Sequence, residues 1–157
     1  MYRKMRRFKQ LMPESESEKI LKNGITGVLS VMGDEGYPYS VPLNYVYYNN
    51  KIYFHSAYEG HKIDSIKRND KVCFCVILKD EVIPEKLSTR YESVICFGKA
   101  KIIQDENLKL ETAKELGYKY CPADKDRVTM EIERFWDKLC MVEITLEQIT
   151  GKKSSRA

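Results

Sequence analysis

Apolar residues alternate with polar ones, or run together, in six stretches of this chain, and each stretch predicts a β-strand. The six stretches are residues 25–32, 37–48, 51–56, 72–78, 91–104 and 139–146. The run at 72–78 is almost continuously apolar, which is typical of a strand covered on both faces. Gly98 interrupts the 91–104 stretch and predicts a shift of pairing register there.

Turn residues predict that neighbouring strands pair as hairpins. Asn49-Asn50 tolerates the positive φ angles of a tight two-residue turn, so strand 51–56 should pair back antiparallel. That strand would place Ile52 and Phe54 on one face and Tyr53 and His55 on the other. Pro42 cannot donate to a β-ladder and therefore predicts a sheet edge, a bulge or an exposed rim.

Helical spacing of apolar residues predicts four helices, at about 15–23, 60–69, 106–118 and 124–135. In the first, we expect Ser15 to be the N-cap, with Glu18 reaching back to it. The remaining segments are a basic arm at 1–12, a polar loop at 79–90 and a frayed tail at 151–157. No repeat or linker divides the chain, so residues 1–157 should form a single domain.

Composition narrows the classes of function. A net charge of +4 falls well short of a dedicated nucleic-acid binder but leaves small anionic ligands open. The five cysteines contain no C-x-x-C pair, which favours reduced thiols and no metal site. No apolar run is long enough to span a membrane, and the basic start lacks the apolar core of a signal peptide, so we expect a cytoplasmic protein.

These elements predict a mainly β fold with flanking helices. Six strands joined largely by hairpins favour a closed antiparallel barrel, because closure removes exposed strand edges. The chain has only two histidines, no Ser-His-Asp spacing and no paired-carboxylate motif. An enzyme of this kind would take its chemistry from a cofactor.

The segment 53–62 is the best candidate binding site, because a strand there runs through a turn into a helix. The first amides of a helix lack intrahelical partners and attract anions. His61 and Lys62 place positive charge at that helix start, which is unfavourable unless an anion binds between them. Gly60 lets the backbone approach closely, and Ser56 offers a hydroxyl that could cap the helix or bind a phosphate. The alternative is an ordinary connection with solvated side chains.

Three segments carry a family resemblance: residues 39–45, the junction His55-Ser56-Ala57-x-x-Gly60-His61-Lys62, and residues 91–100. With them, the sequence resembles the split-barrel flavin-binding superfamily of pyridoxamine-phosphate-oxidase-like proteins. It is most similar to the nitroimidazole-reductase, or nitroimidazole-resistance, branch. The resemblance covers nearly the whole chain and implies a six-stranded antiparallel split β-barrel of the FMN-binding type.

The resemblance also implies where a flavin binds. The first segment would contact the isoalloxazine ring, the junction would hold the phosphate, and the third segment would line the cofactor. An aromatic pair, Phe135-Trp136, would reach across from a second subunit, so FMN would lie at a homodimer interface. The cofactor-binding residues implied in this way are Pro42, Leu43, Asn44, Tyr45, His55, Ser56, Ala57, His61, Lys62, Ser93, Val94 and Trp136.

We therefore expect electron transfer from NADH or NADPH through FMN to a small oxidised acceptor, a nitro compound or a quinone, with no catalytic side chain. The oxidase branch has an arginine-lysine pair where this chain has His61-Lys62, and its long carboxy-terminal substrate motif has no match, so vitamin B6 oxidation is not expected.

Two non-catalytic alternatives stay open. One is a flavin or haem carrier or sensor. The other is a small barrel whose basic arm and strand tyrosines bind single-stranded nucleic acid. These tyrosines are Tyr45, Tyr47, Tyr48 and Tyr53. Trp136 is as well suited to core packing as to a cofactor wall.

Overall fold

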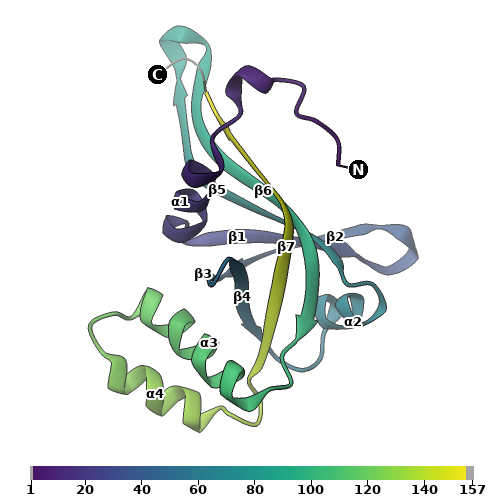
Figure 1. Cartoon of the computed structure of the whole chain (residues 1–157), viewed down its shortest axis with the longest axis vertical. Coiled ribbons are helices and arrows are strands. Elements are labelled where there is room, and N and C mark those ends of the chain that lie inside the picture. The colour runs from purple at the N-terminus through teal and green to yellow at the C-terminus, as the bar shows by residue number, and fades with distance from the viewer. Residues whose placement is uncertain (1, 155–157) are drawn as a thin grey trace.

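The computed structural model describes residues 2–154 and is mainly β, with helices at the margins of one antiparallel sheet (Figure 1). Its strands are β1 (Thr26–Met32), β2 (Pro38–Asn44), β3 (Val46–Tyr48), β4 (Lys51–Ser56), β5 (Lys71–Ile83), β6 (Ser88–Ile102) and β7 (Cys140–Lys153). Its helices are α1 (Glu14–Asn23), α2 (His61–Arg68), α3 (Glu106–Tyr120) and α4 (Lys125–Arg134). Within the described range, no helix is both long enough and apolar enough to cross a membrane.

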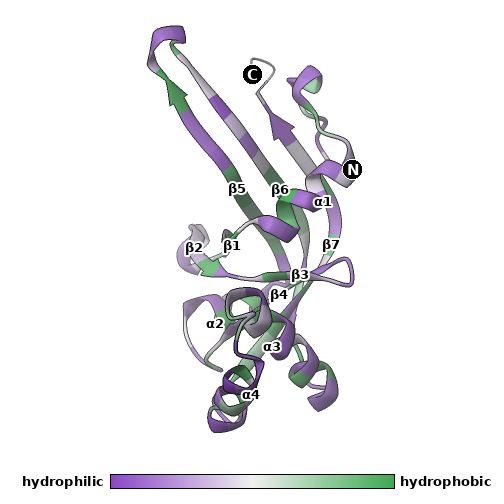
Figure 2. Ribbon diagram, turned by 90° about the vertical axis from the view of Figure 1, so that its left-hand side faces the viewer, coloured by the Kyte–Doolittle hydropathy of each residue, from purple (hydrophilic) through white to green (hydrophobic). Residues whose placement is uncertain are grey.

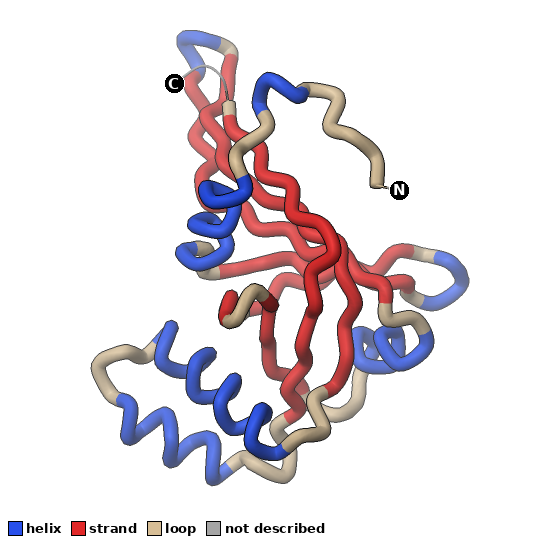
Figure 3. Tube along the Cα trace, in the orientation of Figure 1, coloured by secondary structure: helices blue, strands red, loops and turns tan. Residues whose placement is uncertain are grey.

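The strand order is β2-β1-β5-β6-β7-β4-β3, so the two edge strands are consecutive in the chain and only Tyr45 separates them. Figure 3 shows the strands in red with the helices in blue at their margins. The expectation of six strands in a closed barrel is corrected here. The predicted strand 37–48 is two strands, and among the described residues no ladder joins β2 to β3. The sheet has seven strands and is open, although the chain itself links its two edges.

Tyr45 explains this break, because all of its polar atoms are bonded away from the sheet. Its buried hydroxyl donates to the Leu21 carbonyl at 2.8 Å. Its backbone N–H donates to the Tyr120 hydroxyl at 3.1 Å, and its carbonyl accepts from Lys119 Nζ at 3.0 Å. The end of α3 thus takes the hydrogen bonds that a strand partner would otherwise make.

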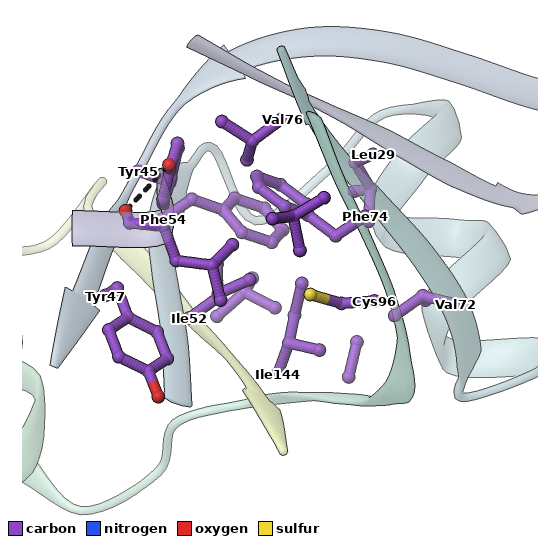
Figure 4. Packing of buried hydrophobic residues seen from close by; sticks show 14 of the residues in the cluster. Leu29, Tyr45, Tyr47, Ile52, Phe54, Val72, Phe74, Val76, Cys96 and Ile144 are labelled. Carbon is purple, nitrogen blue, oxygen red and sulfur yellow. Dashed lines mark hydrogen bonds between the residues drawn. The ribbon is translucent and has the colours of Figure 1, made fainter. Parts of the chain in front are cut away.

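Two apolar clusters lie on opposite faces of β4 and β7. Ile52 and Phe54 point into the main cluster, inside the curved sheet (Figure 4). Tyr53 points to the second cluster, between β4, β7 and the α3–α4 hairpin. The predicted facing of this strand is confirmed for these three residues. Tyr45, Tyr47 and Tyr53 are buried, so they form no surface stripe on which bases could stack.

Three local predictions are confirmed. Asn49 and Asn50 have φ angles of 47° and 59°, and Tyr48 pairs with Lys51 across this two-residue turn. Pro42 lies on the edge strand β2. The register of β6 against β7 shifts between Phe97 and Gly98.

The predicted polar loop at 79–90 is wrong. β5 continues to Ile83, and β6 already begins at Ser88. The two strands form a hairpin arm, and a short 3-10 helix at Pro84–Lys86 makes its turn. Figure 2 shows this arm projecting beyond the rest of the sheet. An arm without a core on either face does not need alternating hydrophobicity, so its sequence carried no strand signal.

The first helix and the tail also differ from expectation. Helix α1 begins at Glu14 after Pro13, and no side chain caps it, so Ser15 is not the N-cap. Gly151–Lys153 belong to β7, where the Met12 N–H donates to the Gly151 carbonyl at 3.0 Å. The tail is therefore paired as far as Lys153, while residues 155–157 of the predicted frayed end lie outside the described range.

Glu143 is the main buried charge of the sheet. Its side chain is 1% exposed and lies 3.1 Å from Lys51 Nζ and 3.2 Å from Lys101 Nζ. The Tyr53 hydroxyl donates to it at 3.2 Å. Burial alone would raise the pKa of Glu143, but hydrogen bonds from both lysines and their charges hold that pKa below its usual value.

We expect the free energy of unfolding to fall as the pH drops below 4.5, because Glu143 has a lower pKa in the folded state than in the unfolded state. Glu143→Gln should remove this part of the acid decline and cost about 1–2 kcal/mol at pH 7, since both lysine partners are solvent-screened. Urea denaturation between pH 3 and pH 7 measures both effects. An unchanged acid slope in the variant would contradict the assignment.

Gly98→Ala should destabilise the protein, because an added Cβ would lie 2.3 Å from the backbone oxygen of Thr145. Such overpacking typically costs about 1–3 kcal/mol. Lys99→Ala, on the exposed neighbouring position, is the control and should change stability by less than about 0.5 kcal/mol. Chemical denaturation measures the free energy of unfolding of both variants. If Gly98→Ala is as stable as the native protein, β7 can move away from the added Cβ and the prediction is contradicted.

Candidate functional site

The predicted binding segment lies where β4 ends and α2 begins. Gly60 precedes the helix with a φ of 116°, and no side chain caps it. Ser56 is 9% exposed, and its hydroxyl oxygen is buried without a hydrogen-bond partner among residues 2–154. Ser56 was predicted to cap the helix or to bind a phosphate, and it does not cap α2. A buried orphan hydroxyl costs free energy unless a ligand or water satisfies it, which suits an anion at this helix start.

The charges of three lysines reach the same end of the β4–β7 pair. Ser56 pairs with Cys140 at the start of β7. Burial raises the pKa of the Cys140 thiol, while the charges of three lysines act in the opposite direction, which places those charges nearby. They are Lys67, Lys109 and Lys62. Lys62 makes no ion pair or side-chain hydrogen bond within the described range, so its charge remains available to a ligand.

Asn44 and His55 both line a hollow of about 650 Å³ beneath the α3–α4 hairpin. The rest of the wall is largely apolar and includes Ala113, Leu116, Val128, Ile132, Phe135, Leu139 and Met141. Its volume and its few polar groups are typical of small-molecule pockets. Protein covers part of the His55 side chain, and this partial burial lowers the pKa of its imidazole. The positive charge of Lys62 lowers that pKa further, so the imidazole is neutral at pH 7.

His61 contacts the turn between β1 and β2. Its ring stacks on Tyr39 with centroids 4.1 Å apart, and its Nε2 lies 3.6 Å from the Asp34 carboxylate. Arg68 pairs with the same carboxylate at 2.6 Å. His61 therefore has partners within the chain, and its phosphate contact stays a prediction.

Other predicted site residues are divided between the surface and the core. Pro42 and Ala57 are exposed, and Leu43 is half-buried against the main cluster. Tyr45 and Val94 are wholly buried. A ligand could approach the first three residues directly, whereas Tyr45 and Val94 can support a site only by shaping the strands that carry it.

Ser93 lies far from the β4–α2 junction of its own chain. It pairs with Lys152 on β7, whereas Ser56 pairs with Cys140, twelve residues earlier on that strand. At about 3.3 Å per residue this separation is roughly 40 Å along the strand, which runs the length of the molecule in Figure 1. One flavin cannot span it, so Ser56 and Ser93 of one chain do not belong to one flavin site.

Trp136 lies on the junction side of its own chain. It is half-buried, and its indole N–H donates to Glu106 at 3.0 Å. Its carbonyl accepts from Lys109 Nζ at 3.0 Å, and the same ammonium lies 3.4 Å from the Tyr58 hydroxyl. Trp136 therefore packs within its own chain, and its contact with a flavin stays a prediction.

Lys109 is the residue that sequence reasoning missed. It is 4% exposed on α3, although buried lysines are rare without a partner charge. One signal was present, because position 109 falls on the same helical face as the apolar residues Ala113 and Leu116. A charged residue on an apolar helix face is a candidate for function, since its burial must be compensated.

Comparison with solved structures finds the same fold in several proteins. A candidate 5-nitroimidazole antibiotic resistance protein from Bacteroides thetaiotaomicron is 26% identical, with a TM-score of 0.76 over 91% of this chain and 86% of that one. An FAD-binding protein from Mesorhizobium loti is 21% identical, with a TM-score of 0.65 over 92% and 97% of the two chains. An FAD and heme binding protein from Mycobacterium smegmatis is 15% identical, with a TM-score of 0.78 over 93% and 74%.

No curated protein matches the sequence. The family model described as pyridoxamine 5'-phosphate oxidase matches residues 13–153, which span α1 through β7 and include every implied cofactor-binding position. The expected recognition is therefore confirmed, and the chain belongs to the pyridoxamine 5'-phosphate oxidase-like family.

Proposed function

We propose that the protein binds FMN at the β4–α2 junction and uses NADH or NADPH to reduce a small oxidised acceptor, a nitro compound or a quinone. The observation that carries this proposal is a Ser56 hydroxyl that is buried beside a helix start without a hydrogen-bond partner among residues 2–154, together with a Lys62 that makes no ion pair in that range. These groups suit a phosphate, because charge-assisted hydrogen bonds to an anion are strong. Bound FMN would supply the hydride and electron transfer.

The protein's own groups would bind and orient. Lys62 and the first amides of α2 would hold the phosphate, while Asn44 offers an amide toward the polar edge of the ring. The apolar hollow beside Asn44 and His55 would receive the acceptor and limit water around it. The similarity to a candidate nitroimidazole resistance protein favours a nitro compound as the acceptor.

A haem carrier is the second candidate, and His55 is the observation that favours it. Its neutral imidazole lines an apolar hollow of about 650 Å³, and neutral imidazole is an axial ligand of haem. A structural relative binds both FAD and heme. A Soret band that His55→Ala abolishes would favour this function, whereas a flavin spectrum with NADH or NADPH oxidation favours the reductase.

We also propose that the protein is a homodimer with each flavin at the interface. If Ser93 and Ser56 both contact flavin, their separation requires that they come from different copies. The outer sheet face offers apolar contacts, because Ile77, Ile95 and Phe97 are 59%, 43% and 42% exposed. Trp136 contacts Lys109 of its own chain, so its predicted reach to the partner's flavin is not part of this proposal.

Lys62→Ala should weaken FMN far more than riboflavin, because riboflavin has no phosphate to lose. The expected loss is about 1.5–3 kcal/mol, which is roughly 10- to 100-fold in affinity. Ser56→Ala should act in the same direction more weakly. Isothermal titration with both ligands measures the difference, and Lys19→Ala, a change of an exposed lysine on α1, is the control.

Equal losses for the two ligands would remove Lys62 from the phosphate site. A native protein that binds neither FMN nor riboflavin would overturn the proposed function itself.

FMN should shift the protein toward dimer, because a ligand bound by two subunits stabilises their association. Sedimentation at low micromolar protein should show more dimer with FMN than without, and flavin should quench the fluorescence of Trp136. Ile95→Glu should give monomers that release FMN, whereas Met130→Glu, at a 67% exposed position on α4, should not. A monomer that binds FMN stoichiometrically would contradict the shared site.

A further inference from the structure

Lys109 carries a buried positive charge that no carboxylate neutralises within residues 2–154. Its Nζ donates to the Trp136 carbonyl at 3.0 Å and to the Tyr58 hydroxyl at 3.4 Å. It also lies 3.9 Å from the centroid of the Trp136 ring. All three contacts are dipoles or a quadrupole, so they stabilise the ammonium without cancelling its charge.

The hydrogen-bond capacity of Lys109 is also incomplete. An ammonium has three donors, and two of them have partners in the part of the chain that the structure describes. A third buried donor without a partner costs free energy comparable to a lost hydrogen bond, and more because it is charged. The arrangement is therefore suited to a ligand that brings both negative charge and acceptor oxygens.

The position of Lys109 identifies the class of that ligand. Tyr58, which contacts its ammonium, lies two residues after Ser56 in the chain and also contacts Lys67 through its carbonyl at 3.5 Å. Ser56, whose hydroxyl has no hydrogen-bond partner among residues 2–154, lies opposite Cys140 in the β4–β7 ladder. The charges of Lys67, Lys109 and Lys62 reach Cys140. The Lys109 ammonium and the Ser56 hydroxyl thus flank the same end of the β4–β7 pair, beside the start of α2. Alternation along β4 puts Ser56 on the face of Ile52 and Phe54, and Lys109 comes from α3 on the opposite face, so a phosphate at the strand end would lie between them.

We propose that Lys109 is a second cation of the phosphate site and selects phosphorylated over unphosphorylated ligands. The inference rests on the proposed FMN function and names a residue from α3 that acts with Lys62. Lys62 is partly exposed and screened by solvent, whereas Lys109 is buried. A phosphate that reaches Lys109 is therefore held by the less screened of the two charges.

Lys109→Met tests this role, because methionine keeps the length and packing of the side chain but removes the charge. FMN affinity should fall at least tenfold, and riboflavin affinity should stay within about twofold. The thermal midpoint of the ligand-free variant should be equal to or above that of the native protein, since an uncompensated buried charge is gone. Lys125→Met is the control, because the exposed Lys125 also lies over a tyrosine ring, 4.9 Å from that of Tyr118, but at the opposite end of the α3–α4 hairpin from Lys109.

Inorganic phosphate gives a second readout that needs no flavin and no turnover. Trp136 is the sole tryptophan and lies under the Lys109 ammonium, so anion binding to that ammonium should change its fluorescence. The native protein should show a saturable change and a raised thermal midpoint with phosphate, relative to chloride at equal ionic strength. Lys109→Met should lose both responses, and Lys125→Met should keep them.

The outcomes separate this inference from the proposed function. If native protein binds FMN and Lys109→Met binds it equally well, the inference is overturned and the function stands. Equal losses of FMN and riboflavin would also overturn it, since they indicate a packing role. If native protein binds no flavin but the phosphate response still depends on Lys109, the function fails and the anion site stands. A native protein without any phosphate response would overturn the anion site directly.

Discussion

The bonding of Tyr45 is the constraint on which the rest of the structure depends. One chain segment supplies both edges of the sheet, and it can do so only because Tyr45 leaves the ladder and enters the core. Its backbone is then satisfied by Tyr120 and Lys119, which fixes the end of α3 against the open sheet. With α3 fixed, the α3–α4 hairpin covers β4 and β7, encloses the hollow beside His55, and brings Lys109 to Tyr58.

The elements that the sequence predicted well are those with local causes. The Asn49-Asn50 turn, the bulge at Gly98 and the four helices depend on residues within a few positions of each other. The break at Tyr45 depends instead on contacts with residues about 75 positions away, and the arm at 79–90 has no core to pattern its sequence. The paired tail likewise depends on its contact with Met12. No window of neighbouring residues contains those causes.

The candidate site divides in the same way. A strand end, a turn and a helix start lie within seven residues of the sequence, at Ser56, Gly60 and Lys62, so the sequence could predict their junction. The structure has this junction between β4 and α2. Lys109 joins them from α3, some 50 positions later, and could be found only once β4 and α3 were packed against each other. Ser93 shows the reverse, because it lies on β6 beside the far end of β7, about 40 Å from the junction of its own chain.

The place of β7 between β6 and β4 has a consequence for how the chain folds during synthesis. β5 and β6 can pair as soon as both have emerged, and β3 and β4 are a local hairpin, but each unit keeps an unpaired edge until the last strand arrives. β4 pairs with β3 at once, but its second partner, β7, follows nearly 90 residues later in the chain. Exposed strand edges invite pairing with other chains, so a ribosome-bound or truncated chain that ends before Cys140 is the form of this protein most prone to aggregate.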